Sequence, residues 1–207
     1  MIELFGEIGH DLLIVTLPPC TSPFRGRIAL AYEMTATKNT NKVVHFIQKY
    51  LYNSTNYKFD DGTTQAINVP YPDSGIYENY IMQYTDARSV DILDVNINQL
   101  LSEAVDQTDA KIERAYEYIL EERGPGNTQT NVLITVGVDD TAAFDGSASS
   151  YMHQLQNKYG FRSIVVSIGK QENYLEKLAE SPDWYFAATD SNGQWVADQI
   201  SRIVCNL

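Results

Sequence analysis

Three short, mostly apolar runs constrain the fold of this chain more than any other feature of its sequence. They cover Ile28–Tyr32, Val132–Val136 and Ile164–Ile168. Continuous apolar runs of this length are typical of parallel strands that are buried on both faces. Segments with the apolar spacing of helices separate the runs. Strands that alternate with helices predict an α/β fold whose mostly parallel sheet is covered by helices on both faces.

The remaining elements complete a doubly wound sheet. Weaker strands are expected at Thr64–Val69 and Tyr77–Tyr84, and the proline-containing loop between them indicates a hairpin at a sheet edge. With a last strand at Trp184–Ala188, we predict a mainly parallel, six-stranded sheet with one antiparallel edge strand at Tyr77–Tyr84. Residues 1–26 are interpreted as a lead-in segment and 27–207 as one domain. Helices are expected over Lys42–Leu51, Ile97–Val105, Ala110–Glu122, Ser147–Tyr159, Glu172–Glu180 and Gln194–Val204.

Charge and hydropathy exclude two classes of partner. The 207 residues carry a formal net charge of -12, and an acidic surface repels the phosphates of nucleic acids and anionic lipids. No window approaches the length of apolar sequence that spans a bilayer, so we expect no membrane insertion. The first residues have Glu3 and Glu7 where a secretory signal has basic residues, so no signal peptide is evident in this chain.

Familiar catalytic motifs are absent from the sequence. There is no nucleophile elbow, phosphate-binding loop or dinucleotide fingerprint. The three histidines, His10, His45 and His153, do not have the spacing of a zinc site. We therefore expect a protein that is not an enzyme. The alternative is a small-molecule enzyme in which Asp139 or Asp140, after a buried strand, acts as a general base.

Polar loops follow two of the buried strands. Glu33, Thr35 and Thr37 come after the first run, and Asp139 follows the second. A further polar turn, Asp106–Asp109, precedes an expected helix. Ligands of doubly wound sheets bind at the carboxyl ends of the strands, where the strand order reverses. Carboxylates and hydroxyls that meet there suit a hard cation such as Mg²⁺ or Ca²⁺.

The order of these elements resembles the von Willebrand factor type A (VWA) domain over roughly Arg27 to Cys205. The segments Asn131–Val136, Arg162–Gly169 and Leu175–Trp184 look like the fourth, fifth and sixth strand regions of that family. The ending from Ala188 to Cys205 is similar to divergent versions found beside C-type lectin domains in secreted invertebrate proteins. The resemblance implies a Rossmann-like fold and a role in adhesion or recognition.

The family's metal-ion-dependent adhesion site (MIDAS) uses the pattern Asp-x-Ser-x-Ser, a threonine and a second aspartate. By resemblance, the ligand set here is Glu33, Thr35, Thr37, Thr108 and Asp139. A strict alignment places Val138 at the last position, and only a shift of one residue brings Asp139 there. Because Mg²⁺ requires near-ideal octahedral geometry, the resemblance implies a degenerate site with no metal or with weakly bound Mg²⁺.

A tyrosine-rich segment is the candidate partner surface. Seven of the 14 tyrosines fall between residues 50 and 84. We take Tyr77, Tyr80 and Tyr84 as binding residues, because tyrosine offers rigid, amphipathic contact area. Plain packing in the sheet and its loops is the alternative.

The two cysteines and one sequon concern the compartment. Cys20 lies just before the first expected strand and Cys205 near the end of the last expected helix, and such points can lie close on one edge of a doubly wound sheet. Some extracellular members of the resembled family have such a bridge, so a Cys20–Cys205 disulfide is expected, with two free cysteines as the alternative. The sequon Asn53-Ser-Thr55 is no evidence of secretion by itself, since chance predicts about two such motifs in this composition.

Together these observations predict a secreted, extracellular recognition or adhesion module that binds a protein or a glycoconjugate. A purely structural spacer domain is a further alternative, beside the enzyme named above.

Overall fold

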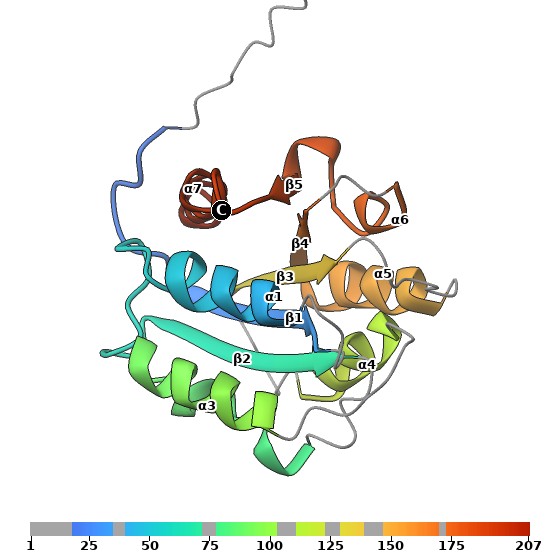
Figure 1. The fold of residues 1–207 in the computed structure, drawn as a ribbon, viewed down its shortest axis with the longest axis horizontal. Helices are drawn as coiled ribbons and strands as arrows, with labels where there is room; N and C mark the ends of the chain where they lie inside the picture. The colour runs from blue at the N-terminus through green and yellow to red at the C-terminus, as the bar shows by residue number, and fades with distance from the viewer. Residues whose placement is uncertain are drawn as a thin grey trace, which may run out of the picture.

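The protein is described by a computed structural model over residues 18–34, 40–71, 78–102, 111–122, 129–138, 147–169 and 173–207. Within these residues one sheet has the strand order β2-β1-β3-β4-β5, and every neighbouring pair is parallel (Figure 1). The order reverses between β1 and β3, so the sheet is doubly wound as expected. The strands are β1 (Gly26–Glu33), β2 (Thr64–Tyr71), β3 (Thr130–Val138), β4 (Phe161–Ile168) and β5 (Tyr185–Ala188).

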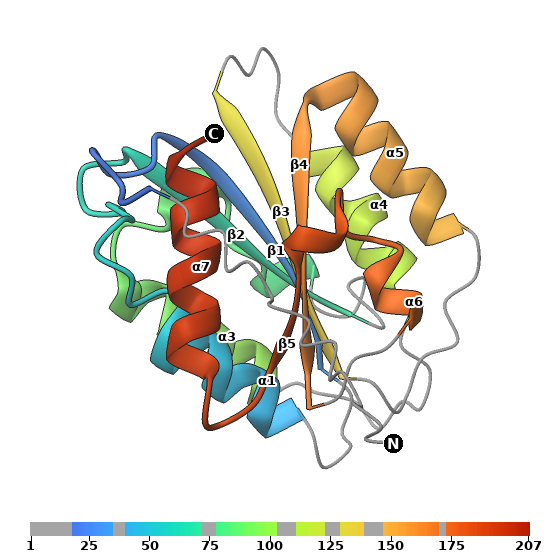
Figure 2. The same ribbon diagram turned by 90° about the horizontal axis from the view of Figure 1, so that it is seen from above.

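Helices cover both faces of the sheet. Seen from above, α1, α3 and α7 lie on one side of the strands, and α4, α5 and α6 lie on the other (Figure 2). In the described part of the chain, no helix has the length and apolar character needed to cross a membrane. The helices are α1 (Thr40–Phe46), which continues as the π-helical turn η1 (Ile47–Leu51), α3 (Val90–Ser102), α4 (Ile112–Glu122), α5 (Ser147–Tyr159), α6 (Asn173–Glu176) and α7 (Gly193–Cys205).

The three apolar runs form the buried centre of the sheet, as predicted. Every residue of Ile28–Tyr32 and of Val132–Val136 has no exposed surface, and Ile164–Ile168 is buried throughout. Since each strand is covered on both faces, both alternating sets of side chains must be apolar or hydrogen-bonded. Thr135, the polar residue of the run Val132–Val136, shares a hydrogen bond of 2.6 Å with the Tyr116 hydroxyl of α4.

The prediction of an antiparallel edge strand at Tyr77–Tyr84 is wrong for the described residues of that segment. Glu78–Tyr80 and Tyr84–Asp86 form 3₁₀ turns, η2 and η3. In the described part of the chain β2 is itself the edge strand of the sheet, paired in parallel with β1. The buried residues here are Ile81, Tyr84 and Ala87. Their spacing of three does not fit a strand, whose side chains on one face recur every two residues.

Two helices differ in length from the prediction. The helix expected at Ile97 begins at Val90, and its buried face is formed by Leu93, Asn96, Ile97 and Leu100. The polar residue Asn96 interrupts the apolar pattern, so the apolar periodicity alone does not reveal the first two turns of this helix. The helix expected over Glu172–Glu180 is the single turn α6, followed by turns up to Ser181.

Candidate functional site

The carboxyl ends of β1, β2 and β3 meet at the point where the strand order reverses. Glu33 ends β1, Tyr71 ends β2 and Val138 ends β3. Glu33 and Tyr71 are direct neighbours in the register of β1 and β2. We call this region the carboxyl end of the sheet, and in doubly wound folds it is where ligands bind.

Glu33 joins two strands at the carboxyl end. Its Oε2 atom accepts a hydrogen bond of 2.7 Å from the backbone N–H of Val138, and its side chain is buried. The register of β1 and β3 ends at the pair Tyr32 and Val136. The carboxylate therefore continues the connection between these strands beyond their backbone pairing, and a charge-assisted bond to a backbone amide is stronger than a neutral one.

Two tyrosine hydroxyls donate hydrogen bonds to backbone carbonyls at the end of β3. Tyr71 donates to the Val136 carbonyl and Tyr174 donates to the Val138 carbonyl, both at 3.0 Å. Burial, and next the nearby Glu33 carboxylate, raise the pKa of Tyr71 well above its ordinary value, so its hydroxyl keeps its proton. Gly137 makes this approach possible, because a Cβ atom at Gly137 would lie 2.7 Å from the Tyr71 hydroxyl.

Of the predicted metal ligands, the structure describes only Glu33. Thr35, Thr37, Thr108 and Asp139 lie outside the described residues. The donor that is described has one carboxylate oxygen engaged by a backbone amide. Among the described residues no three His, Cys, Asp or Glu side chains gather in a group that could hold a metal ion. What the structure shows at the carboxyl end is a set of hydrogen bonds within the protein.

The predicted tyrosine surface is not brought together by the described residues. Tyr77 lies outside them. Tyr80 is half-buried and lines a surface groove. Tyr84 is 4% exposed, and the Arg27 guanidinium lies 4.9 Å from the centre of its ring. Burial raises the pKa of Tyr84, and a side chain so enclosed offers almost no surface to a partner.

The groove beside Tyr80 has a volume of about 430 Å³ and is open to solvent. One wall is the segment Asn79–Met82, and the other is a flank of α3 formed by Asp91, Ile92, Val95, Asn96 and Gln99. Asn96 fixes the two walls together, because its side-chain amide donates 2.7 Å to the Tyr80 carbonyl and accepts from Asn68. We call this feature the α3 groove.

Sequence reasoning missed the α3 groove because the helix was expected to start at Ile97. Val95 is 66% exposed and Ile92 is 39% exposed, and both are large apolar side chains. The spacing of Ile92, Val95 and Gln99 places them on one flank of a helix. An apolar flank outside the buried face of α3 is the signal that a longer predicted helix would have revealed.

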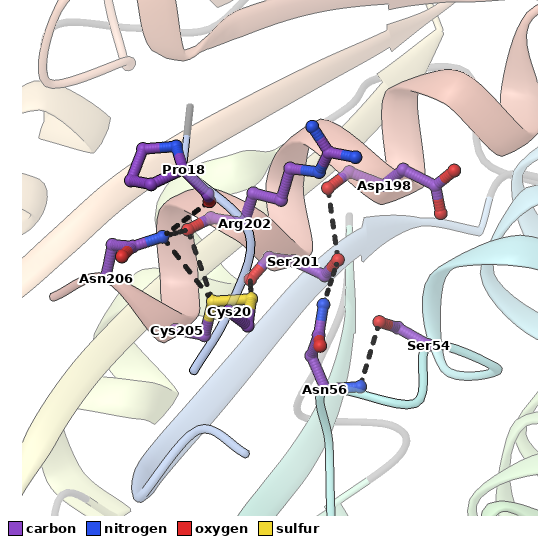
Figure 3. The surroundings of a disulfide bond; sticks show 9 residues. All are labelled: Pro18, Cys20, Ser54, Asn56, Asp198, Ser201, Arg202, Cys205 and Asn206. Carbon is purple, nitrogen blue, oxygen red and sulfur yellow. Dashed lines mark hydrogen bonds between the residues drawn. A yellow bond between two sulfur atoms is a disulfide. The ribbon is translucent and has the colours of Figure 1, made fainter. Parts of the chain in front are cut away.

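The opposite end of the sheet, its amino end, is held by the expected disulfide. Cys20 and Cys205 are bonded, with their Cα atoms 5.8 Å apart (Figure 3). Asn56, in the connection before β2, donates 3.0 Å to the Ser201 hydroxyl of α7. The Phe24 amide donates 2.8 Å to the Asn56 carbonyl, so the segment before β1 is fixed here too.

Comparison of the sequence with known proteins identifies one close relative. The uncharacterized Caenorhabditis elegans protein C18H9.6 is 74% identical over 174 residues, which is 84% of this chain and all of that protein. No family model matches the chain.

Comparison of the structure gives several similar folds. Proximal thread matrix protein 1 from the mussel byssus has a TM-score of 0.69 at 13% identity, over 90% of this chain and 48% of that chain. The chain thus spans about half of the mussel protein, which has also been solved with a zinc-occupied MIDAS motif. Manganese-loaded TRAP protein of Plasmodium vivax has a TM-score of 0.57 at 13% identity, over 86% of this chain and 73% of that chain. The vWF domain of the pili tip protein Mfa5 from Porphyromonas gingivalis has a TM-score of 0.62 at 7% identity, over 89% of this chain and 96% of that chain. At these identities the likeness concerns the fold.

Proposed function

The chain belongs to one family with the Caenorhabditis elegans protein C18H9.6 and is a VWA-like domain, and from this premise we propose that it is a non-enzymatic extracellular recognition module. In this proposal residues 27–207 are the module and residues 1–26 lead into it. The ligand is an extracellular protein that inserts apolar side chains into the α3 groove. A glycoconjugate is the other ligand class that the module could take, and it is an outcome of the test below.

The α3 groove is the observation that carries this proposal. Ile92 and Val95 are two of the four large apolar side chains that are exposed among the described residues. Exposed apolar patches with a polar rim are typical of protein interaction sites. Tyr80 also lines the groove, and tyrosine is enriched at such interfaces.

Charge favours one kind of protein segment for the groove. Asp91 lines it, no lysine or arginine is among its lining residues, and the whole chain carries a net charge of -12. A segment with apolar side chains flanked by basic ones complements this surface, since opposite charges steer association and disfavour wrong partners.

The carboxyl end supports recognition without catalysis. Its described polar side chains are engaged with the backbone of β3: Glu33 with the amide of Val138, and Tyr71 and Tyr174 with carbonyls. A general base needs a carboxylate poised toward a substrate. The rival enzyme would depend on Asp139 or Asp140, and turnover of a small molecule by the purified protein would establish it.

We propose that any Mg²⁺ at the carboxyl end binds weakly. In the MIDAS-like set implied by the resemblance, Glu33 is longer than the family's aspartate, and its Oε2 already accepts the Val138 amide. Mg²⁺ tolerates few departures from octahedral geometry. A tight site that is lost on replacing Thr35 and Thr108 together would overturn this part of the proposal.

The disulfide supports an extracellular compartment for this module. Disulfides persist in oxidising environments and are rare in the cytosol, and Cys20 and Cys205 are bonded in this structure. The similar folds include a matrix protein of the mussel byssus and a pili tip protein, which favours the same compartment here.

The test is capture of extracellular proteins by the immobilised, disulfide-bonded chain, with Mg²⁺ in one arm and a chelator in the other. The variants are Val95→Asp and Tyr80→Ala in the α3 groove and Glu33→Ala at the carboxyl end. Ser150→Asp places the same new charge on an exposed position of α5 and is the matched control. We expect the groove variants to lose a captured protein that wild type, Ser150→Asp and both metal arms retain.

Three results would contradict the proposal. Capture that survives Val95→Asp and Tyr80→Ala removes the α3 groove as the surface. Capture by wild type of glycans alone, from a panel of purified glycoconjugates, assigns the other ligand class. No capture of either class leaves the domain as a structural spacer.

A further inference from the structure

The sequon Asn53-Ser-Thr55 lies in a surface turn at the amino end of the sheet. Asn53 comes two residues after the end of η1, and its side chain is exposed, as is that of Thr55. Acceptors of N-linked glycans need this sequence and an accessible position. The sequence alone provided only the motif, and the structure adds the accessibility.

The hydrogen bonds of Asn53 are compatible with a modified side chain. The Nδ2 atom donates 2.6 Å to the Gln48 carbonyl and 3.3 Å to the Lys49 carbonyl, which are orphan carbonyls at the end of a helical segment. A glycosylated asparagine keeps one hydrogen on Nδ2. One of the two bonds can therefore be kept while the other is exchanged for the sugar.

A glycan at Asn53 would leave the α3 groove open. Just before Asn53 in the chain, Gln48 contacts α3 through the Asp94 carbonyl and the Asn98 side chain. The groove is lined by Ile92, Val95 and Gln99 of the same helix, which the helical spacing places on another flank from Asp94 and Asn98. Gln48, whose carbonyl accepts from the Asn53 side chain, therefore meets α3 on a different flank from the one that lines the groove.

The neighbouring residues place the sequon beside the disulfide. Ser54 Oγ accepts from the Asn56 amide, and the Asn56 side chain donates to Ser201, near Cys20 and Cys205 (Figure 3). The disulfide points to a compartment in which the lumenal glycosylation machinery also works. The disulfide and the accessibility of the sequon are two independent observations that favour the same modification.

We propose that Asn53 is an N-glycosylation site. The donor is an oligosaccharide that is activated as a lipid-linked pyrophosphate. The Asn53 Nδ2 atom attacks the anomeric carbon of the first sugar, the carbon–oxygen bond to the pyrophosphate breaks, and the lipid pyrophosphate leaves with the bonding electron pair. The Nδ2 atom gives up one proton, and no oxidant or reductant takes part.

This inference shares with the proposed function only the passage through a secretory compartment. It does not depend on the α3 groove or on any ligand. A chain without a binding partner would still carry the glycan, and a chain without the glycan would still expose the groove, so the two proposals fail separately.

The test is expression of the full chain behind a cleavable secretion signal in an animal cell line, with intact mass measured on protein from the medium and from the endoplasmic reticulum. Wild type is expected to carry a mass increment that peptide-N-glycosidase removes while converting Asn53→Asp. Thr55→Ala should abolish the increment, and Thr55→Ser, which restores the hydroxyl, should keep it. Asn56→Gln is the neighbouring control and should also keep it.

Two outcomes would overturn the proposal. One is wild-type protein that has the Cys20–Cys205 bond, shown by mapping without reductant, and carries no glycan. The other is an increment that persists in Thr55→Ala. Because Thr55→Ala leaves the Asn53 amide and its helix-capping bonds in place, its loss of mass cannot be confused with a failure to fold.

Discussion

The two ends of the sheet are closed in different ways. At the amino end, a covalent bond joins Cys20 to Cys205 across a sequence separation of 185, and Asn56 adds a hydrogen bond to α7. At the carboxyl end, Glu33 and Tyr71 bond the backbone of β3 without covalent help. The disulfide at the amino end restricts the conformations of the unfolded chain. The hydrogen bonds at the carboxyl end satisfy buried polar groups of the folded chain. The difference teaches that the ends should respond to different perturbations.

Loss of the disulfide should have the largest effect. Replacing Cys20→Ala and Cys205→Ala together is expected to lower the free energy of unfolding by about 4–5 kcal/mol, because the unfolded chain gains the entropy of a long open loop. Denaturation in guanidinium chloride measures the loss. Wild type in reductant is the control and should match the double variant. A loss below about 1 kcal/mol would show that the amino end does not depend on its covalent bond.

The second prediction addresses the carboxyl end. Glu33→Ala leaves the buried Val138 amide without its acceptor and should cost about 2–3 kcal/mol of unfolding free energy. Glu33→Gln keeps an acceptor oxygen at nearly the same length and should cost distinctly less. Urea denaturation of both variants separates the two terms. Equal losses would mean that the charge of Glu33, and not its hydrogen bond, supports this end.

Tyr71→Phe should have a smaller effect at the same end. It removes the hydroxyl that donates to the Val136 carbonyl while keeping the ring, so about 1 kcal/mol should be lost. Thermal unfolding followed by circular dichroism measures it. Tyr174→Phe is the matched control, because its hydroxyl bonds the same strand from a less buried position. A larger loss in Tyr174→Phe than in Tyr71→Phe would contradict the expectation that the more buried hydrogen bond contributes more to stability.

The smallest effect is expected between the two ends, at Asp94 on α3. Burial, and next the like charge of Asp91, raise the pKa of Asp94 above its ordinary value, and its Oδ1 atom is buried without a hydrogen-bond partner in the described structure. The folded protein therefore holds the proton of the Asp94 carboxyl group more tightly than the unfolded chain does. The stability that protonated Asp94 contributes is present at low pH and is lost as the pH rises through the raised pKa.

At neutral pH the folded protein must hold an ionised Asp94 in a partly buried position, which costs free energy, and Asp94→Asn removes this cost. The variant should unfold at a slightly higher temperature than wild type at pH 7, and the two should coincide near pH 3, where wild-type Asp94 is protonated in both states. Asp91→Asn is the control, and it should give a smaller gain because it removes only the like charge. A wild type that is the more stable protein at pH 7 would show that the Asp94 carboxylate has a favourable partner.

The centre of the fold could be predicted because burial on both faces of a strand requires a continuous apolar run, which is visible in the sequence. A strand such as Val132–Val136 must be apolar at successive positions, and the helix at Ser147–Tyr159 ends at Gly160, whose φ of 67° suits a helix terminus. At the edge of the sheet the sequence pattern is weaker. Tyr80 and Tyr84 fit a strand by propensity, but the packing of Tyr84 into the core decides the local conformation.

The candidate site was predictable only in part, for a related reason. The end of a buried strand predicted that Glu33 would lie at the carboxyl end. Its bond to Val138 depends on the relative register of β1 and β3, which no local pattern encodes. The role of Tyr71 was missed because the expected strand ended at Val69 and left Tyr71 in the following loop. In the structure β2 extends to Tyr71 and ends beside Glu33.

The disulfide also determines how the chain carries a mechanical load. Tension applied at Pro18 and Leu207 enters the domain at Cys20 and leaves it at Cys205, whose Cα atoms are 5.8 Å apart. The force passes through the sulfur bridge, and the sheet and helices lie outside its path. Without the bridge, the same pull could draw out roughly 600 Å of extended chain. With the bridge intact, the domain behaves as a link of fixed length that keeps its surfaces folded under strain.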